Sequence, residues 1–312
     1  MMEKEVQLNL GKVCNNLCKF CMTDIPLNKR KFIPFSQIKK ELKQFRDKNY
    51  NVVGFLGGEL TIYPQIIELI AFADRLGYKR INLVSNGRRY SDMSFLKKLV
   101  QAGNIKFYIS IHSHEEKTED FLTSINGGFR EKIRGLYNLN LLRKKGIIKE
   151  KISVNLVVNK LNYKVLPRTL LFYFKNFDIK DFRLNFIKPD GRAMKNFKIL
   201  VPTYKETMPY LKQCFLLSKK MNMDVSSEGI PFCAMKNIKN FRDFVGESKD
   251  SKNIIEGEKN RQEFQYDEFR KDRLRTKTPK CGKCIYNSSC EGPWTNYAEI
   301  YGFKEFKPII RN

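Results

Sequence analysis

The sequence has no long hydrophobic run and only two histidines. No uninterrupted apolar stretch approaches the roughly 20 residues that cross a bilayer, and the N-terminal residues lack the apolar core of a signal peptide. We therefore expect a cytoplasmic protein with no membrane partner. No Ser-His-Asp triad or pair of catalytic carboxylates is evident in the sequence.

Acidic residues are scarce: 33 Asp and Glu stand against 59 Lys and Arg, which gives a net charge of +26. Such an excess suggests an acidic partner, such as a nucleic acid, an anionic peptide or an acidic electron-transfer protein. Solvated faces of lysine-rich helices, as in residues 39–48 and 142–151, would produce the same excess. Because no basic stripe is interleaved with aromatic residues for stacking bases, we do not favour a nucleic acid.

The eight cysteines are unevenly distributed, and six of them form two tight clusters: Cys14, Cys18 and Cys21, and Cys281, Cys284 and Cys290. In a cytoplasmic protein this pattern favours metal ligation or catalysis over disulfides. Both clusters are therefore candidate metal sites.

Strand-like and helix-like segments alternate from the start of the chain. Apolar, β-rich runs occur at residues 5–10, 52–56, 80–85, 106–112, 151–159 and 181–189. Between them, apolar residues recur at spacings of three and four, as in amphipathic helices. A repeated βα unit predicts parallel strands with right-handed crossovers. We therefore predict an α/β fold, a partial (β/α)6 barrel of the TIM type, with its active site at the carboxyl ends of the strands.

The pattern changes after a further predicted helix at residues 202–222. Residues 234–280 are charged and poor in aliphatic side chains, and a compact cysteine-bearing tail follows them. We predict a barrel in residues 1–222 and a cysteine-rich auxiliary-cluster extension in residues 223–312.

The first cysteine cluster follows the first predicted strand directly, which places it on a loop over the mouth of the barrel. Three thiolates can hold three irons of a [4Fe–4S] cube and leave the fourth iron open. A structural zinc ion would need a fourth ligand nearby, and no His or Cys occurs between residues 22 and 111. The incomplete ligand set favours a site that also binds another molecule.

The spacing Cys-x3-Cys-x2-Cys, with Phe20 before the last cysteine, resembles the signature of the radical S-adenosylmethionine (SAM) superfamily. The resemblance implies that Cys14, Cys18 and Cys21 ligate a [4Fe–4S] cluster and that its open iron chelates the amino and carboxylate groups of SAM. It also implies a low-potential electron donor, a ferredoxin or flavodoxin. A tight cysteine trio also occurs in zinc and ferredoxin-like proteins, so other motifs have to decide.

A second motif follows the second predicted strand. Gly57, Gly58 and Glu59 stand where the superfamily has a Gly-Gly-Glu motif that receives the SAM amino group. Glycines let the main chain approach a ligand closely, and a carboxylate suits an ammonium group. Leu60 replaces the proline that usually comes next, which leaves the local shape of the loop open.

A third motif follows the third predicted strand. Ser85 and Asn86 match a common Thr-Asn-Gly that lies near the ribose and methionine ends of SAM in the superfamily. An Asn-Gly pair is also an ordinary turn. Three motifs in order at three successive strand ends nevertheless make coincidence improbable.

Later strand ends carry weaker cofactor-binding candidates: His112, Asn155, Phe186 and Ile187. His112 lies in a stretch that resembles the Ser-x-His…His-Asp of relatives, with Glu119 in place of the second histidine. We expect His112 to close the barrel mouth rather than to act as a base. The other three occupy places where relatives hold the ribose and adenine of SAM, and a structural role in the core is an equal alternative.

The loop after the sixth predicted strand carries Asp190 and Arg192. Both side chains could face a substrate. A type I or II turn explains the Pro-Asp-Gly sequence equally well.

The tail spacing Cys281-x2-Cys284-x5-Cys290 resembles the C-terminal part of the SPASM and twitch extensions, which hold auxiliary iron–sulfur clusters. Four cysteines would complete a closed cluster, and we predict Cys233 as the fourth because of its turn-like Gly-Pro context. Cys214 lies in an apolar helix stripe and is predicted to be a buried thiol. Too few cysteines remain for the two clusters of a full SPASM domain, so the resemblance favours one auxiliary [4Fe–4S] cluster. A four-cysteine zinc site is the alternative.

The resemblance implies an enzyme that reductively cleaves SAM at its [4Fe–4S] cluster to a 5′-deoxyadenosyl radical, which abstracts hydrogen from a substrate. The barrel would exclude water and aim the radical at one C–H bond. Relatives with auxiliary clusters favour a peptide or protein substrate that is being matured. Modification of RNA, a nucleotide or a cofactor precursor is the enzymatic alternative, and a metal-stabilised RNA-binding protein is the non-catalytic one.

Overall fold

The computed structural model describes residues 3–236, 252–256 and 261–311. Within them, nine strands form a single sheet in the order β7-β6-β5-β4-β3-β2-β1-β8-β9. Neighbouring strands from β7 to β8 pair in parallel, and β9 pairs antiparallel with β8. The strands are β1 (Glu5–Asn9), β2 (Val52–Leu56), β3 (Arg80–Ser85), β4 (Ile105–Ser110), β5 (Ser153–Val158), β6 (Asp181–Phe186), β7 (Asp224–Glu228), β8 (Lys252–Glu256) and β9 (Arg261–Gln265).

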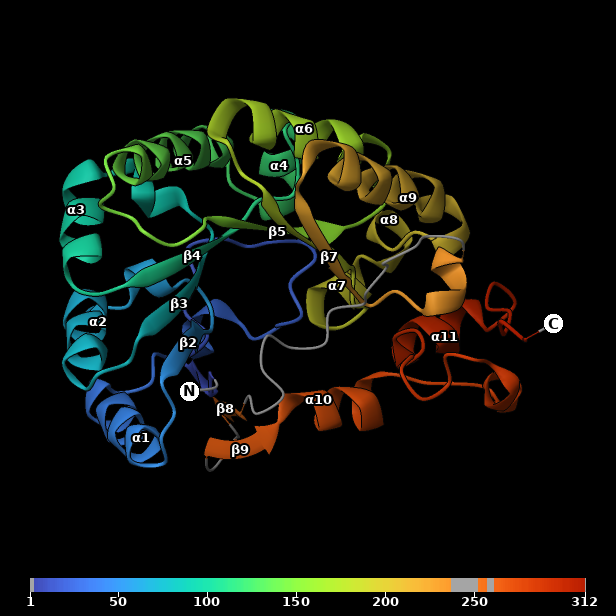
Figure 1. Cartoon of the computed structure of the whole chain (residues 1–312), viewed down its shortest axis with the longest axis horizontal. Helices are drawn as coiled ribbons and strands as arrows, with labels where there is room; N and C mark the ends of the chain where they lie inside the picture. Colours follow the sequence, from blue (N-terminus) through green and yellow to red (C-terminus); the bar gives the residue numbers. More distant parts are fainter. Residues whose placement is uncertain (1–2, 237–251, 257–260, 312) are drawn as a thin grey trace.

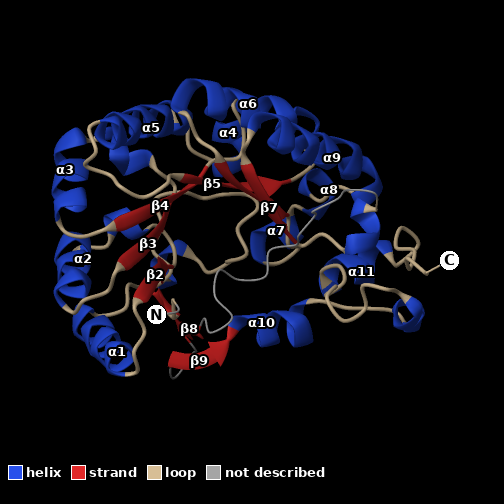
Figure 2. Cartoon of the chain, in the orientation of Figure 1, coloured by secondary structure: helices blue, strands red, loops and turns tan. Residues whose placement is uncertain are grey.

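The strands curl into an open arc, and the helices that connect them cover its outer side (Figures 1 and 2). None of the helices in the described ranges combines the length and apolar character needed to span a bilayer. The α-helices are α1 (Phe35–Asp47), α2 (Ile66–Arg75), α3 (Met93–Gln101), α4 (Glu116–Thr123), α5 (Gly128–Lys144), α6 (Leu166–Phe177), α7 (Gly191–Lys195), α8 (Phe197–Leu200), α9 (Tyr204–Met221), α10 (Tyr266–Phe269) and α11 (Thr295–Tyr301).

The core lies between the strands and these outer helices. The first four residues of β2 are all buried, as expected for a parallel strand with both faces covered. Helix α1 buries Ile38, Leu42 and Phe45, whose spacing of three to four residues places them on one helix face toward the sheet. The same alternation of buried strands and amphipathic helices is what the sequence displays, and the predicted α/β partial barrel is confirmed.

Strand β7 is a seventh parallel strand, where the sequence analysis predicted six. It pairs with β6 from Asp181↔Asp224 to Asn185↔Glu228. Its sequence, DVSSE, has one large apolar residue, Val225, and therefore lacks the pattern of a buried strand. Because β7 follows the boundary placed after residue 222, the sheet of the first segment continues beyond it, and the division into two domains stays a prediction.

Strands β8 and β9 were also not predicted, since KNIIE and RQEFQ are too polar to stand out as strands. Strand β8 extends the sheet at β1, and Arg261 at the start of β9 ties this addition to the barrel. The Arg261 guanidinium donates to both carboxylate oxygens of Glu41 (2.5 and 2.8 Å) and to the carbonyl of Asn9 (2.8 Å).

The C-terminal segment runs along the open side of the arc, from β9 through α10 to α11 (Figure 1). Tyr266 donates a hydrogen bond to Glu228 at the end of β7 (3.4 Å). Trp294 Nε1 donates to the carbonyl of Phe186 at the end of β6 (3.1 Å). The segment thus contacts the carboxyl ends of two strands, where the mouth of the barrel lies.

Candidate active site

A cavity of about 360 Å³ opens at the carboxyl ends of the strands. This volume lies within the range of small-molecule sites. The structure brings every site residue predicted for the barrel into the wall of this one cavity: Cys14, Cys18, Phe20, Cys21, Gly57, Gly58, Glu59, Ser85, Asn86, His112, Asn155, Phe186 and Ile187.

The cysteine loop after β1 is held in place by the end of α4. Leu17 N–H donates to the carbonyl of Thr123 (3.1 Å), and Lys19 N–H donates to the carbonyl of Leu122 (2.9 Å). All three cysteines of the loop are partly buried, and all three line the cavity.

Burial favours the neutral form of the Cys14 and Cys18 thiols. Burial raises the pKa of Cys14, and burial raises the pKa of Cys18 to about 12 against the opposing charge of Lys132. The Cys21 sulfur accepts a hydrogen bond from the Thr23 N–H (3.4 Å). Metal ligation requires thiolates and would therefore release protons at this site.

Gly57 and Gly58 lie where the second motif touches the cysteine loop. Gly58 N–H donates to the carbonyl of Gly11 (2.9 Å), and Glu59 N–H donates to the carbonyl of Val13 (2.8 Å). A Cβ on Gly58 would stand 2.0 Å from the Val13 oxygen, and Gly57 has a φ of +144°. These glycines, which the sequence analysis explained by the approach of a ligand, are required here by the approach of the cysteine loop.

Replacement of Gly58 by alanine should therefore displace the cysteine loop. We expect the free energy of unfolding of the metal-free protein to fall by about 1–3 kcal/mol, as in other overpacked sites, and iron retention after reconstitution to fall with it. Denaturant unfolding and iron analysis are the measurements. Gly282→Ala is the matched control, since a Cβ there meets no atom within 4 Å. Equal stability of the two variants would contradict this account of Gly58.

Glu59 joins the second and third motifs into one network. One carboxylate oxygen accepts from Thr61 N–H (2.9 Å), Thr61 Oγ1 (2.6 Å) and Ser85 Oγ (2.7 Å), and the other accepts from Asn86 N–H (2.6 Å). The side chain is buried. The second oxygen, with a single donor, retains capacity for another hydrogen bond. Binding of the SAM amino group by Glu59 stays a prediction.

Asn86 ties this network to the cysteine loop. Its Nδ2 donates to Asn15 Oδ1 (2.8 Å), and its Oδ1 accepts from Arg88 N–H (3.0 Å). Arg88 Nη1 donates in turn to the Asn15 carbonyl and to Asn16 Oδ1, both at 2.9 Å. The Asn86 amide is thus engaged in positioning the cysteines, and its predicted contact with SAM stays a prediction.

His112 forms part of the cavity wall. Its Nδ1 accepts a hydrogen bond from Val157 N–H (3.1 Å), and its ring meets that of Phe20 edge-on at 4.4 Å. Burial, only partly opposed by the charge of Glu119, lowers the pKa of His112 to about 4. The ring is therefore neutral near pH 7. Its low pKa also makes it a weak base, which fits a wall residue better than a general base.

Asn155 and Phe186 differ in how free they are to bind a ligand. The Oδ1 of Asn155 is buried and has no hydrogen-bond partner in the described part of the chain. The Phe186 ring stacks on Tyr204 with centroids 4.0 Å apart. Both Phe186 and Ile187 are almost fully buried. The Phe186 ring thus packs against the core where the core meets the cavity, and contact of Asn155, Phe186 and Ile187 with a cofactor stays a prediction.

Several cavity residues were missed or undervalued by sequence reasoning. Lys132 on α5 reaches the cavity, and Tyr266 and Trp294 reach it from the C-terminal segment. The available signal for Lys132 was a charged residue in the apolar stripe that includes Leu136 and Leu139. The two aromatic residues gave no signal, because their approach depends on how the tail folds back.

Arg192 lines the cavity as well. From the sequence alone, a contact with substrate and a structural role in a turn were equally good explanations of this residue. Its backbone N–H donates to the Cys21 carbonyl (2.9 Å), which fixes the loop after β6 to the cysteine loop. Its Nε is buried without a hydrogen-bond partner among the residues that the structure describes. The guanidinium is therefore free to meet an anionic group.

The tail cysteines and Cys233 share one small cavity outside the barrel: Cys233, Cys281, Cys284 and Cys290 all line it. Burial raises the pKa of Cys233 to about 11, and the three other sulfurs add to the shift. Within the described ranges, no three Cys, His, Asp or Glu side chains are gathered as tightly as one metal ion with bonds of about 2.3 Å requires. The four thiols line one cavity of about 30 Å³, and the auxiliary [4Fe–4S] cluster and its zinc alternative both stay predictions. Cys214 is fully buried in α9, as predicted.

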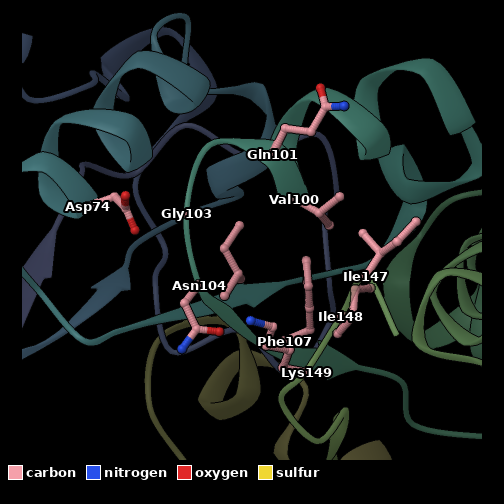
Figure 3. A pocket seen from close by; sticks show the side chains of 10 residues that line it. Asp74, Val100, Gln101, Gly103, Asn104, Phe107, Ile147, Ile148 and Lys149 are labelled. Atoms are coloured by element: carbon pink, nitrogen blue, oxygen red, sulfur yellow. The ribbon is translucent and has the colours of Figure 1, made fainter. Parts of the chain in front are cut away.

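A further cavity of about 390 Å³ lies at the opposite end of the barrel, near the amino ends of β4 and β5 (Figure 3). Val100, Phe107, Ile147 and Ile148 supply much of its wall, and none of its lining residues is a cysteine or histidine. This end of such barrels serves stability rather than catalysis. We assign it no chemical role.

The barrel cavity suits an iron–sulfur cluster together with a polar organic ligand. Its three thiols are the soft ligands that iron–sulfur clusters prefer. Asn16 Nδ2, Asn155 Oδ1 and Arg192 Nε are buried without a partner in the described protein, and all three residues line the cavity. Unpaired buried polar atoms cost about 1–3 kcal/mol each, and a polar ligand in the cavity would supply partners for these three.

An open parallel barrel with three cysteines in the wall of the cavity at its mouth is an arrangement that fits an iron–sulfur enzyme. The sequence profile of the Radical SAM superfamily matches residues 8–172, more than half of the chain, and the chain belongs to this superfamily. The resemblance found in the motifs is confirmed. Members of this superfamily use a [4Fe–4S] cluster and SAM. Cys14, Cys18 and Cys21 would hold the cluster in this chain, and the cluster when bound would supply the electron for SAM cleavage.

The sequence identity between this chain and individual known proteins is low. A probable GTP 3',8-cyclase of Saccharolobus islandicus (strain Y.N.15.51 / Yellowstone #2) is 26% identical over 201 residues, which cover 62% of this chain and 60% of the relative. The chain thus spans about 60% of the length of the curated relatives that it matches.

Two solved structures of SuiB from Streptococcus suis share the fold. The one bound to S-adenosylmethionine has a TM-score of 0.67 at 18% identity, and the match covers 100% of this chain and 76% of SuiB. The one bound to the precursor peptide SuiA has a TM-score of 0.60 at 19% identity, covering 81% and 57% of the two chains. At such identities the likeness establishes the fold alone.

Proposed function

We propose that this radical SAM enzyme modifies a peptide or protein substrate and that Cys233, Cys281, Cys284 and Cys290 hold an auxiliary [4Fe–4S] cluster. The observation that carries the proposal is the composite cavity: its floor holds Cys14, Cys18 and Cys21, and Tyr266 and Trp294 of the C-terminal segment form part of its wall. A substrate that reaches the barrel mouth therefore also meets the segment that carries the second cysteine site.

The C-terminal segment is held against the barrel by hydrogen bonds. Trp294 Nε1 donates to the Phe186 carbonyl, and Asn296 Nδ2 donates to the Pro189 carbonyl (2.8 Å). Within the segment, Arg275 lies over the Trp294 ring at 3.7 Å and so helps to hold it in place. These contacts fix the substrate wall and relate the two cysteine sites. They support a single enzyme in which both sites belong to one reaction.

The peptide class is supported by the extent of the fold match. The likeness to SuiB covers the whole chain, tail included, and a second SuiB structure contains a precursor peptide. The sequence match to the probable GTP 3',8-cyclases covers 62% of this chain. A match that includes the tail is the more informative one, because the tail forms part of the cavity.

A nucleotide substrate is the second candidate, favoured by the charge of the cavity. Lys12, Arg30, Lys188 and Arg192 all line it. Arg192 has an unpartnered Nε in the described structure, and phosphate groups are natural partners of such guanidinium groups. The names of the curated relatives point the same way.

The electron donor is proposed to be an acidic ferredoxin or flavodoxin. The chain carries a net charge of +26, and the cysteine loop is flanked by the exposed Met22 (59%) and Leu27 (57%). An acidic partner would be attracted to this side of the molecule by charge and held by apolar contact.

The deciding experiment offers both substrate classes to anaerobically reconstituted enzyme with SAM and dithionite. One set of reactions contains GTP, and the other contains synthetic peptides encoded by short reading frames next to the gene. We expect a mass change in a peptide that requires enzyme and SAM and accompanies 5′-deoxyadenosine release. Consumption of GTP with matching 5′-deoxyadenosine, and no peptide modified, would establish the nucleotide candidate instead.

A further inference from the structure

A fully buried ion pair lies beside the cysteine loop. Lys132 Nζ and Glu119 Oε1 are 2.5 Å apart, and neither side chain is exposed to solvent. Lys132 comes from the second turn of α5 and Glu119 from α4. Lys132 also lines the cavity that holds Cys14, Cys18 and Cys21.

The pair is held rigidly and in its charged form. Lys132 Nζ also donates to the carbonyl of Ser110 (2.9 Å). The second oxygen of Glu119 accepts from the N–H groups of His112 (2.7 Å) and Ser113 (2.9 Å). The Lys132 ammonium lowers the pKa of Glu119 even though burial acts to raise it. Glu119 is therefore held as a carboxylate, and these hydrogen bonds fix the Lys132 side chain in position.

Stability does not explain this pair. Buried ion pairs contribute no more to folding than well-packed apolar residues of similar volume, and often less. The buried residues one and two turns further along α5 are Leu136 and Leu139, so an apolar side chain would continue the stripe at position 132. A retained buried charge at the edge of a reaction cavity indicates an electrostatic role.

Lys132 is the partner of the pair that lies on the cavity side. It lines the cavity together with Cys14, Cys18 and Cys21, whereas Glu119 is not among the residues that line it. A negative charge added in the cavity is therefore stabilised by the nearer ammonium more than it is opposed by the carboxylate.

We propose that Lys132 is a positioning residue that raises the reduction potential of the cluster held through Cys18, and that Glu119 fixes the ammonium for this purpose. One-electron reduction, with the electron coming from the external low-potential donor, adds one negative charge to the cluster. A fixed cation beside one of its thiolates stabilises the reduced form. The proposal rests on cluster ligation by Cys14, Cys18 and Cys21 and is independent of the substrate class.

The test is a redox titration of the reconstituted enzyme followed by electron paramagnetic resonance, without substrate. The cluster of interest is the one whose signal changes when SAM is added. We expect Lys132→Met to make its one-electron reduction at least tenfold less favourable, a shift of about 59 mV to lower potential. Glu119→Gln should shift the potential in the opposite direction and by less. The double variant should lie between Lys132→Met and the unmodified enzyme.

Arg130→Met is the matched control, because it removes an exposed cation from the same helix (79% exposed). Its potential should equal that of the unmodified enzyme. An unchanged potential in Lys132→Met with full iron content, or an equal shift in Arg130→Met, would overturn the proposal. So would a loss of SAM affinity in Lys132→Met without any change in potential.

If Lys132→Met does not assemble a cluster, the reduction potential is measured in the double variant Glu119→Gln/Lys132→Met instead. The double variant removes both charges, so no unpaired carboxylate stays buried. A potential equal to that of the unmodified enzyme would overturn the proposal. Absence of any cluster from the unmodified enzyme is a different result, since it would remove the proposed function itself.

Discussion

Replacing Cys18 or Cys21 with alanine should abolish the release of 5′-deoxyadenosine from SAM. Cys14, Cys18 and Cys21 are the cysteines among the residues that line the barrel cavity. His112 cannot substitute for them readily, because its Nδ1 is engaged by the Val157 N–H and its ring is packed against Phe20. A cluster left with two thiolates would not persist. The measurement is chromatography of the nucleoside after anaerobic reaction with SAM and dithionite.

Cys214→Ala is the control for this loss. Cys214 is fully buried in α9 and lies outside both cysteine cavities. Its replacement should leave iron content and 5′-deoxyadenosine release unchanged, with at most a modest loss of stability from the smaller side chain. Normal turnover by Cys18→Ala or Cys21→Ala would remove the assignment of these residues as cluster ligands.

Replacing Cys281 and Cys284 together should halve the iron content, from about eight to about four atoms per chain, and leave the barrel cluster in place. The two thiols line the tail cavity with Cys233 and Cys290, and none of these four lines the barrel cavity. Iron analysis gives the stoichiometry, and the SAM-dependent paramagnetic signal reports whether the barrel cluster survives.

Two further results would separate the alternatives at the tail. Cys233→Ala alone should also lower the iron content, because Cys233 shares the cavity with the three tail cysteines although it lies 48 positions before Cys281 in the sequence. Stoichiometric zinc in protein purified without added iron, with about four irons after reconstitution, would show a zinc site instead.

The sequence predicted the parts of the fold whose residues repeat a simple pattern. Strands β1 to β6 are apolar runs between amphipathic helices, and the site motifs follow their ends directly. Loops at the carboxyl ends of neighbouring parallel strands must meet, so the convergence of Cys14, Glu59 and Ser85 followed from topology alone.

What the sequence could not predict depends on contacts between distant segments. Strand β7 has too few apolar residues to be recognised, and its pairing with β6 is what makes it a strand. The ion pair of Lys132 and Glu119 joins two helices. The sequence showed Glu119 only as the replacement for a histidine and Lys132 only as a charge on an amphipathic segment, and nothing in it paired the two. The role of Gly58 was also not predictable, because it depends on the backbone of Val13 rather than on a ligand.

The pairing of β1 with β8 has a consequence for the synthesis of the protein. Val6 pairs with Lys252, so the ribosome synthesises the two paired strands at widely separated times. At about 5–20 residues per second, β1 leaves the ribosome roughly 12–50 s before β8 exists. During that interval one edge of β1 is an open template for strand pairing with other chains. Next to it, the oxygen-sensitive thiols of the cysteine loop are exposed on the nascent chain, so yield in the cell should depend on how well chaperones cover this first strand.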